Sequence, residues 1–322
     1  MKRIIAGYTA APAEAVAAAA YYDVLLQVPE ADGLEFAWNG APTPAQLAPV
    51  LSRIPRAWTI TLNDIPATWR ASVQQPTFGL ASPDESGRKA AIAMVREVHA
   101  GIRAMNDNAG RNIVLATEFH CAPGFDNRVV DGDANAFKRS LDEMSTMDWE
   151  GCSVMIEHCD AFLPGQKPAK GFLRLHDEIA VLKGLAGAPI GLSLNWGRSL
   201  IEVRDAERVM DHVVQAAGAG VLKAFTFSGT AGSDNVYGSA WADSHLPFAD
   251  TTDRAFAEPA SMMTTARVLA VLPYLDRCQF VAIKTNWPAK RTDPLERAAS
   301  VVANFYTLFD VMNHSERHSI AT

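Results

Sequence analysis

The stretch Cys152-Ser-Val-Met-Ile-Glu157 is a short apolar run that ends on a carboxylate. Three further runs of this kind follow at residues 190–195, 221–227 and 279–284, and each ends on or next to a polar residue. Longer amphipathic segments separate them. Short apolar runs that alternate with such segments predict buried strands joined by helices, which is typical of a parallel sheet.

The same alternation continues toward the N-terminus. Strands are expected at residues 3–8, 33–37, 58–62 and 112–118, with a long loop after the third of them. Helices are expected at 12–27, shortly after Pro44, and at 83–105, 133–147, 171–186, 204–217, 258–272 and 294–312. Ser82 is expected to be an N-cap, with Glu85 at capping-box spacing. Eight units without a strong linker favour one (β/α)8 barrel domain over residues 1–322, with an open doubly wound sheet as the alternative.

The composition is that of a globular protein and argues against a nucleic-acid-binding or membrane-spanning protein. The 322 residues carry a net charge of -7 and are 48% hydrophobic, as in an ordinary globular chain. The acidic balance, without a basic stripe, argues against nucleic-acid binding. No apolar run approaches the roughly 20 residues that cross a bilayer.

The cysteines and the N-terminus bear on location. Four cysteines form no CxxC pair, which favours free thiols in a reducing cytoplasm. Met1-Lys2-Arg3 precedes an Ala-rich stretch, but Pro12 and Glu14 interrupt it before a signal-peptide core is complete. A cytoplasmic location is therefore expected. The Ala-rich helices leave a homo-oligomer open.

Polar residues stand at the ends of the expected strands, where barrel enzymes keep their chemistry. They are Glu35, Glu118, His120, Glu157, Asn195, Arg198, Thr226, Ser228 and Lys284. Glu118 and His120 are two residues apart, so both face the same side of a strand. The same alternation turns Ser153 and Met155 inward with Glu157. If the barrel closes, these side chains converge on one cavity.

Several of these residues also have a simpler interpretation. Glu35 alone could cap a helix or pair with a surface arginine. His158 alternates away from Glu157 and is expected in a loop or behind the site, and Asp160 is expected in a turn. Cys121 and Cys159 are expected to be inert.

The chain resembles the xylose-isomerase-like TIM barrels, which include sugar isomerases, sugar epimerases and an endonuclease branch. Within that group it is similar to a bacterial family known only as a domain of unknown function. The resemblance spans most of the chain and rests on the order of five motifs. These are Gly33-Leu-Glu35, Met155-Ile-Glu157-His158, Gly191-Leu-Ser-Leu-Asn-Trp-Gly-Arg198, Asp243-Ser-His245 and Phe280-Val-Ala-Ile-Lys284.

The resemblance implies a divalent metal held by Glu, Asp, His and Glu, with the glutamates as acid and base. Glu157 matches the first glutamate, and His245 is the candidate histidine. Asn195 stands where the aspartate is expected, and Lys284 where the second glutamate is expected. These departures predict a degenerate metal site in which the Lys284 ammonium pairs with Glu157. A Mn2+, Zn2+ or Mg2+ ion on Glu157, Asn195 and His245 stays open, as does one on Glu118, His120, Glu157 and His245.

The favoured function is an isomerase or epimerase of a sugar, sugar acid or polyol. Glu157 would be the general base, Lys284 or His120 the electrophile, and Glu118 a further catalytic group. Substrate contacts are expected from Glu35, Asn195, Arg198, Ser228, His245, Trp196 and Trp287. The stretch 228–247, with Tyr237 and Trp241, is either a lid or an ordinary connector.

Four other functions are left open. One is an aldolase or lyase that forms a Schiff base on Lys284. Another is a barrel that binds a metabolite without turning it over. Glycoside hydrolysis ranks lower because the strand at 221–227 ends without a carboxylate. The endonuclease reading ranks last, since neither a His-rich metal cluster nor a basic channel is evident.

Overall fold

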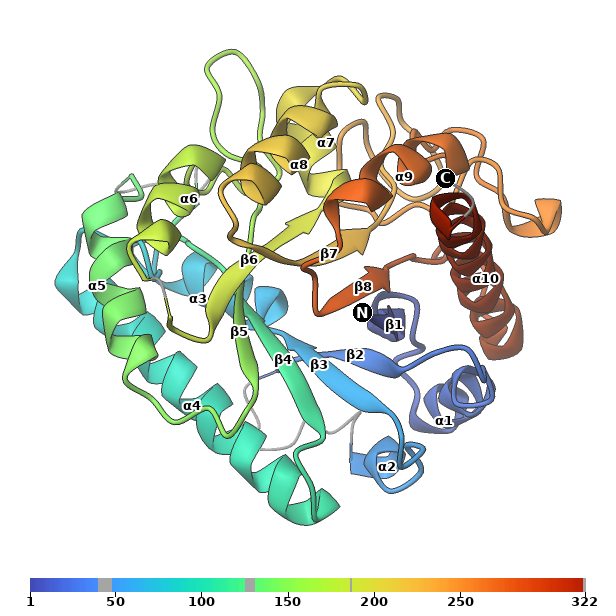
Figure 1. Ribbon diagram of the computed structural model, residues 1–322, viewed down its shortest axis with the longest axis horizontal. Helices are drawn as coiled ribbons and strands as arrows, with labels where there is room; N and C mark the ends of the chain where they lie inside the picture. The colour runs from blue at the N-terminus through green and yellow to red at the C-terminus, as the bar shows by residue number, and fades with distance from the viewer. Residues whose placement is uncertain (40–47, 125–130, 186, 321–322) are drawn as a thin grey trace.

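Eight parallel strands close a barrel in chain order in a computed structural model, which describes residues 1–39, 48–124, 131–185 and 187–320. The expected (β/α)8 barrel is confirmed, and the open-sheet alternative is wrong. Figure 1 shows the strands around a common centre with helices outside them. The strands are β1 (Lys2–Ile5), β2 (Gly33–Ala37), β3 (Thr59–Asn63), β4 (Val114–Phe119), β5 (Ser153–Glu157), β6 (Ile190–Asn195), β7 (Leu222–Phe227) and β8 (Phe280–Ile283).

The helices form the outer layer of the barrel. They are α1 (Ala15–Leu25), α2 (Ala48–Leu51), α3 (Ile65–Gln74), α4 (Glu85–Ala109), α5 (Ala134–Ser145), α6 (Leu175–Lys183), α7 (Trp196–Val203), α8 (Val209–Gly218), α9 (Thr265–Val271) and α10 (Pro294–Ile320). The C-terminal helix α10 packs against α1 and α9, beside the start of the chain (Figure 1). Among the described helices, none has both the length and the apolar character to span a bilayer.

Some expected element boundaries are wrong. The long loop expected after β3 contains α3, whose Pro66 lies in the first turn, where proline is tolerated. Asp84, not Ser82, caps α4 by accepting a hydrogen bond from Gly87 N. The helix expected at 258–272 begins only at Thr265. The residues directly after Pro44 lie outside the described part of the chain, and α2 begins at Ala48.

Apolar residues pack on both faces of the sheet, outside and inside the barrel. Side chains that point outward from the strands, such as Leu34, Ile156 and Leu194, pack under the helices in the main core. A smaller cluster fills the inside of the barrel: Ile4, Ala6, Ala116, Met155, Ala224, Phe280 and Ala282. Because side chains alternate along a strand, the next inward positions toward the C-terminal ends lie directly above this plug. Those positions carry the polar residues.

Candidate active site at the barrel mouth

The strand register brings polar residues from distant parts of the chain to one level of the barrel. Asn63 of β3 pairs with Glu118 of β4. Glu157 of β5 pairs with Ser193 of β6, and Asn195 of β6 pairs with Thr226 of β7. All six side chains are buried. The convergence expected from strand alternation is therefore present.

Glu157 lies at the centre of this group, and four side chains contact its carboxylate. Arg198 Nη1 lies 2.7 Å from Glu157 Oε2. Asn63 Nδ2 donates to the same oxygen at 2.8 Å, and His120 Nε2 lies 2.9 Å from it. Asn195 Nδ2 donates to Oε1 at 3.1 Å. This set of donors holds Glu157 in one orientation and favours its ionised form.

Glu118 lies beside Glu157 because one amide contacts both. Asn63 Nδ2 donates to Glu118 Oε2 at 2.5 Å as well as to Glu157. The other oxygen of Glu118 accepts a hydrogen bond from Ser193 Oγ at 2.7 Å. Glu118, unlike Glu157, has no basic residue in hydrogen-bond contact among the described residues.

His120 connects Glu157 to Asp64, the residue that follows β3. His120 Nδ1 lies 2.6 Å from Asp64 Oδ1, and its Nε2 lies 2.9 Å from Glu157. Burial lowers the pKa of His120, but its hydrogen bonds to Asp64 and Glu157 raise it more. The two carboxylates therefore favour the protonated form of the imidazole.

Lys284 pairs with Glu35 instead of Glu157. Lys284 Nζ lies 2.7 Å from Glu35 Oε1, and both side chains are buried. The ammonium also lies 5.0 Å from the centre of the Tyr8 ring. The expected Lys284–Glu157 pair is wrong. Arg198, in the helix α7 that follows β6, occupies the position beside Glu157. The second oxygen of Glu35 has no hydrogen-bond partner in the described part of the chain.

Arg198 is placed by the start of α7. Asn195 caps this helix through Oδ1, which accepts hydrogen bonds from Gly197 N and Arg198 N. A Cβ atom on Gly197 would lie 2.6 Å from Ser228 O, so only glycine allows α7 to begin so close to β7. Because α7 begins so close to β7, the Arg198 side chain lies over the end of the barrel and contacts Glu157.

The segment after β7 covers the cluster. Asp243 Oδ2 lies 3.2 Å from Arg198 Nε and 3.4 Å from Lys170 Nζ. His245 Nδ1 lies 3.0 Å from Ser228 Oγ and 3.5 Å from Asp243 Oδ1. His245 adopts a left-handed φ of 53°, which is uncommon for a residue other than glycine. The segment is thereby fixed over the mouth by charged contacts.

The two central glutamates differ in their pKa. Burial raises the pKa of Glu157, but Arg198, Lys284 and His120 lower it more, so the pKa lies well below its usual range. Burial and the nearby charges of Glu157 and Glu35 raise the pKa of Glu118 well above its usual range. These opposed shifts favour the carboxylate form of Glu157 and the carboxylic acid form of Glu118. Two carboxyl groups with opposed pKa shifts are the usual arrangement of an acid and a base.

The donor set does not fit a divalent metal. Asn195 Oδ1 caps α7 and its nitrogen faces Glu157, so the amide offers no free oxygen. His245 Nδ1 contacts Ser228, and Arg198 occupies the open side of Glu157. The described residues contain no group of three or more His, Cys, Asp and Glu side chains arranged to hold a metal ion. The alternative set with Glu118 and His120 meets the same obstacle.

A second buried polar cluster supports β5 from behind. His158 Nδ1 lies 2.8 Å from Glu178 and its Nε2 lies 3.1 Å from Glu202. Cys121 Sγ donates to Glu178 at 2.7 Å. The placement of His158 behind the site agrees with the sequence interpretation. Burial raises the pKa of Cys121 and Cys159, which keeps both thiols protonated, as expected for inert cysteines.

Residues 4–299 match a protein family described as a domain of unknown function (DUF4862). The chain belongs to this family. An uncharacterized protein of Salmonella typhimurium (strain LT2), STM3670, is 40% identical over 240 residues, which cover 73% of this chain and 72% of that protein. The family found through its motifs is thus confirmed.

Solved structures share the fold at low sequence identity. A putative xylose isomerase from Rhodospirillum rubrum has a TM-score of 0.64 at 15% identity, and the match covers 96% of this chain and 99% of that protein's chain. The IOLI protein with a bound zinc atom has a TM-score of 0.61 at 12% identity, covering 98% and 99%. An L-ribulose 3-epimerase has a TM-score of 0.59 at 14% identity, covering 99% and 97%. The xylose-isomerase-like TIM barrel fold is therefore confirmed.

The structure brings most of the expected site residues together. Glu35, Glu118, His120, Glu157, Asn195, Arg198, Ser228, His245 and Lys284 all line or cover the barrel mouth. Trp196 and Trp287 instead pack in the main hydrophobic core, and Trp287, on the loop after β8, also lines a cavity outside the mouth. The sequence analysis gave no site role to Asn63, Asp64, Tyr8 or Asp243, although it quoted Asp243 in the motif Asp243-Ser-His245. Asn63 and Asp64 directly follow the apolar run of β3, which is the signal that identified the other strand-end residues.

Proposed function

We propose that this protein is an isomerase or epimerase of a sugar, sugar acid or polyol that moves a proton with Glu157 and Glu118 at the barrel mouth. The observation that carries the proposal is the opposed pKa shift of these two neighbouring carboxyl groups. The fold is also that of solved sugar epimerases and isomerases. Such reactions need one base and one acid beside a single carbon atom.

In the proposed reaction the Glu157 carboxylate removes a proton from the carbon beside the substrate carbonyl. The electron pair of the broken C–H bond moves into an enolate, and the negative charge develops on the carbonyl oxygen. For epimerisation, Glu118 gives its proton to the opposite face of the same carbon, the carbonyl re-forms, and Glu157 is left protonated and Glu118 ionised. For isomerisation, the proton is returned to the former carbonyl carbon, and the proton of the neighbouring hydroxyl passes to the enolate oxygen. Asn63, which binds both carboxyl groups, fixes their positions relative to each other.

Cationic side chains of this protein would stabilise the negative charge that develops on the carbonyl oxygen. Lys284 and Arg198 are buried, and burial strengthens their attraction to an anion. We propose that they serve where related barrels use a metal, because the residues around Glu157 do not suit a divalent ion. In this proposal, Lys284 stands in place of a carboxylate because its ammonium stabilises the developing oxyanion.

The Schiff-base alternative receives less support. Burial lowers the pKa of Lys284, but Glu35, Tyr8 and Glu157 raise it well above its usual range. An amine held as ammonium is a poor nucleophile. Glycoside hydrolysis also receives less support, because β7 ends at Phe227, followed by Ser228, without a carboxylate.

Substrate access requires the segment after β7 to move. The catalytic side chains are fully buried under Asp243 and His245. Breaking the Asp243–Arg198 and Asp243–Lys170 contacts would free this segment. The structure described here then corresponds to the closed state.

Deuterium exchange tests the proposal directly. Ketoses, aldoses and sugar acids would be incubated with the protein in D2O and followed by NMR for exchange at the carbon beside the carbonyl. We expect exchange with at least one compound, its loss in Glu157→Gln, its retention in the exposed control Glu207→Gln, and no effect of EDTA.

Each other outcome supports a different function. A compound that stabilises the protein against heat without exchanging would support a binding barrel. A borohydride-trapped adduct on Lys284 would support Schiff-base chemistry. Loss of exchange on chelation, restored by Mn2+, would overturn the metal-independent site.

A further inference from the structure

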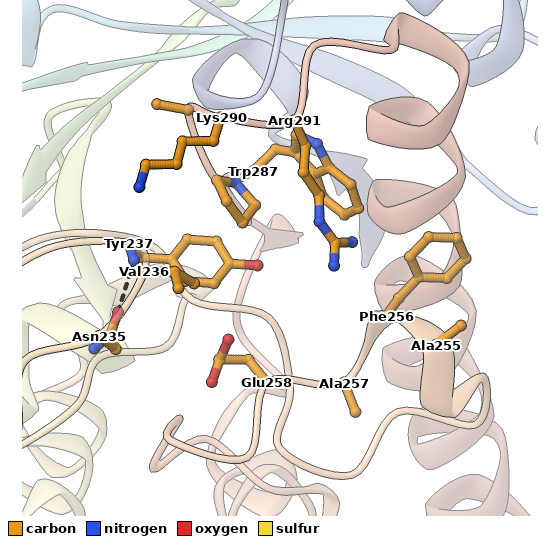
Figure 2. Close-up of a pocket in the computed structure, with 12 residues that line it drawn as sticks. Asn235, Val236, Tyr237, Ala255, Phe256, Ala257, Glu258, Trp287, Lys290 and Arg291 are labelled. Atoms are coloured by element: carbon orange, nitrogen blue, oxygen red, sulfur yellow. Dashed lines mark hydrogen bonds between the residues drawn. The ribbon is translucent and has the colours of Figure 1, made fainter.

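A second cavity lies outside the barrel mouth, between the loops that follow β7 and β8. Its volume is about 480 Å3, within the range of small-molecule sites. The residues used in the argument are Asn235, Tyr237, Phe256, Glu258, Trp287 and Arg291. Figure 2 shows Tyr237 and Glu258 along one side of this space and Arg291 and Phe256 along the other.

The walls combine aromatic rings with polar groups. Trp287 is buried, while Tyr237 and Phe256 are half-buried at the cavity edge. The Phe256 and Trp287 rings lie 6.1 Å apart at 54°. The Arg291 guanidinium lies 5.1 Å from the centre of the Trp287 ring, and its Nη1 lies 3.5 Å from Glu296 Oε1. Aromatic faces suit the apolar faces of a sugar ring, and carboxylate and guanidinium groups suit its hydroxyls.

The charges favour a neutral ligand. Glu258 lines the cavity with Lys290 and Arg291, and Arg291 is also paired with Glu296, so the two cations face two carboxylates and the local charges balance. The Glu258 carboxylate and the Arg291 guanidinium together offer acceptors and donors on different sides, as a ring of hydroxyl groups requires. A pyranose ring matches this pattern better than an anion does.

The cavity adjoins the barrel mouth. Trp287 follows Lys284 by three residues, which span at most about 10 Å of chain. Asn286 N donates to His245 O at 2.7 Å, which joins the loop after β8 to the segment that covers the site. Tyr237 belongs to the same segment, between Ser228 and His245. A ligand in the cavity and a sugar at the mouth are therefore close enough to belong to one molecule.

We infer that this cavity binds a pyranose ring and that the substrate of the barrel is a glycoside, whose reacting sugar lies at the mouth and whose second ring lies between Tyr237 and Trp287. The inference rests on the proposed function for the reacting sugar. Binding in the cavity itself does not depend on turnover, so the two can be tested apart.

The test measures binding of cellobiose, maltose, lactose and sucrose, with glucose for comparison, by saturation-transfer NMR and calorimetry. Binding would be measured in the wild type and in Glu157→Gln. We expect at least one disaccharide to bind both proteins more tightly than glucose. The Kd should rise at least tenfold in Tyr237→Ala and in the milder Glu258→Gln.

The matched control is Tyr274→Ala, since Tyr274 is exposed and precedes β8 at the other end of the barrel. Its Kd should equal that of the wild type. The inference is overturned if no disaccharide binds, or if Tyr237→Ala and Glu258→Gln bind as the wild type does. Inorganic phosphate that binds at this cavity, and binds more tightly in Glu258→Gln, would overturn it in favour of an anion site. Disaccharide binding without deuterium exchange would overturn the proposed function and the assignment of a glycoside substrate, and would leave only the sugar-binding cavity.

Discussion

Arg198 Nη1 lies 2.7 Å from Glu157 Oε2, and both side chains are almost completely buried. The pair is joined by His120 on one side and by Asp243 on the other. A buried carboxylate that loses its cation becomes costly, so the pair controls both the stability and the charge of the site.

Arg198→Met keeps much of the side-chain volume but removes the charge. Loss of one partner of a buried ion pair costs about 3–5 kcal/mol, so the free energy of unfolding should fall by that order. The pKa of Glu157 should rise, which moves the acidic limb of the kcat/KM profile to higher pH. Denaturant unfolding and pH–rate profiles measure both effects. Arg208→Met, at an exposed arginine, should change neither.

Glu118→Gln tests the protonated state of the acid. A glutamine resembles a protonated carboxyl in shape and charge, so unfolding at pH 7 should change little. Activity should fall by about 10²- to 10⁴-fold, the usual contribution of a general acid. A loss of several kcal/mol in stability would instead indicate that Glu118 is ionised in the native protein.

The cluster behind β5 predicts a pH dependence of stability. Burial lowers the pKa of His158, but Glu178 and Glu202 raise it more, to about 10. The native state thus holds this proton above pH 6.5, where the unfolded state has lost it. The stabilisation from His158 is complete below pH 6.5 and is lost as the pH rises toward 10.

The partner of His158 limits stability on the acidic side. Burial raises the pKa of Glu202, but His158 and His212 lower it more, to about 2. Its contribution is present above about pH 4.5 and is lost as the pH falls toward 2. The difference in unfolding free energy between the wild type and His158→Gln should be largest near pH 5–6 and shrink by pH 10. A difference that stays constant over this range would contradict the assignment.

Gly197→Ala tests the close contact that aims Arg198. The added Cβ would meet Ser228 O at 2.6 Å, so the start of α7 must shift. Overpacking of this kind costs about 1–3 kcal/mol, and activity should fall as well because Arg198 moves. Gly218→Ala, in α8 with open space around the added atom, should raise stability by about 0.4–1 kcal/mol. Thermal unfolding of both variants measures the contrast.

Most of the barrel could be predicted from the sequence. Buried strands such as β5 and β6 are continuous apolar runs with a polar end, so their position and direction follow from local pattern. The helices α3 and α7 could not be predicted in this way. Each begins directly at the end of a strand, and its first residues read as strand end or loop until the fold places them.

The candidate site divides in the same way. Strand alternation placed Glu118, His120, Glu157 and Asn195 inside the barrel, because the side-chain period of a strand is two whatever its neighbours are. The resemblance to a family added the expected metal positions. Neither revealed that Asn63 joins the two central glutamates, since β3 was expected to end one residue earlier.

The sequence by itself determined the alternation of strands and helices, and which residues of each strand face the interior, because both follow from local periodicity. Only the tertiary structure decided the partners. Lys284 pairs with Glu35 and Arg198 with Glu157, although the sequence suggested Lys284 with Glu157. Such pairing depends on the strand register and on the approach of Gly197 to Ser228, which are set by packing between segments far apart in the chain.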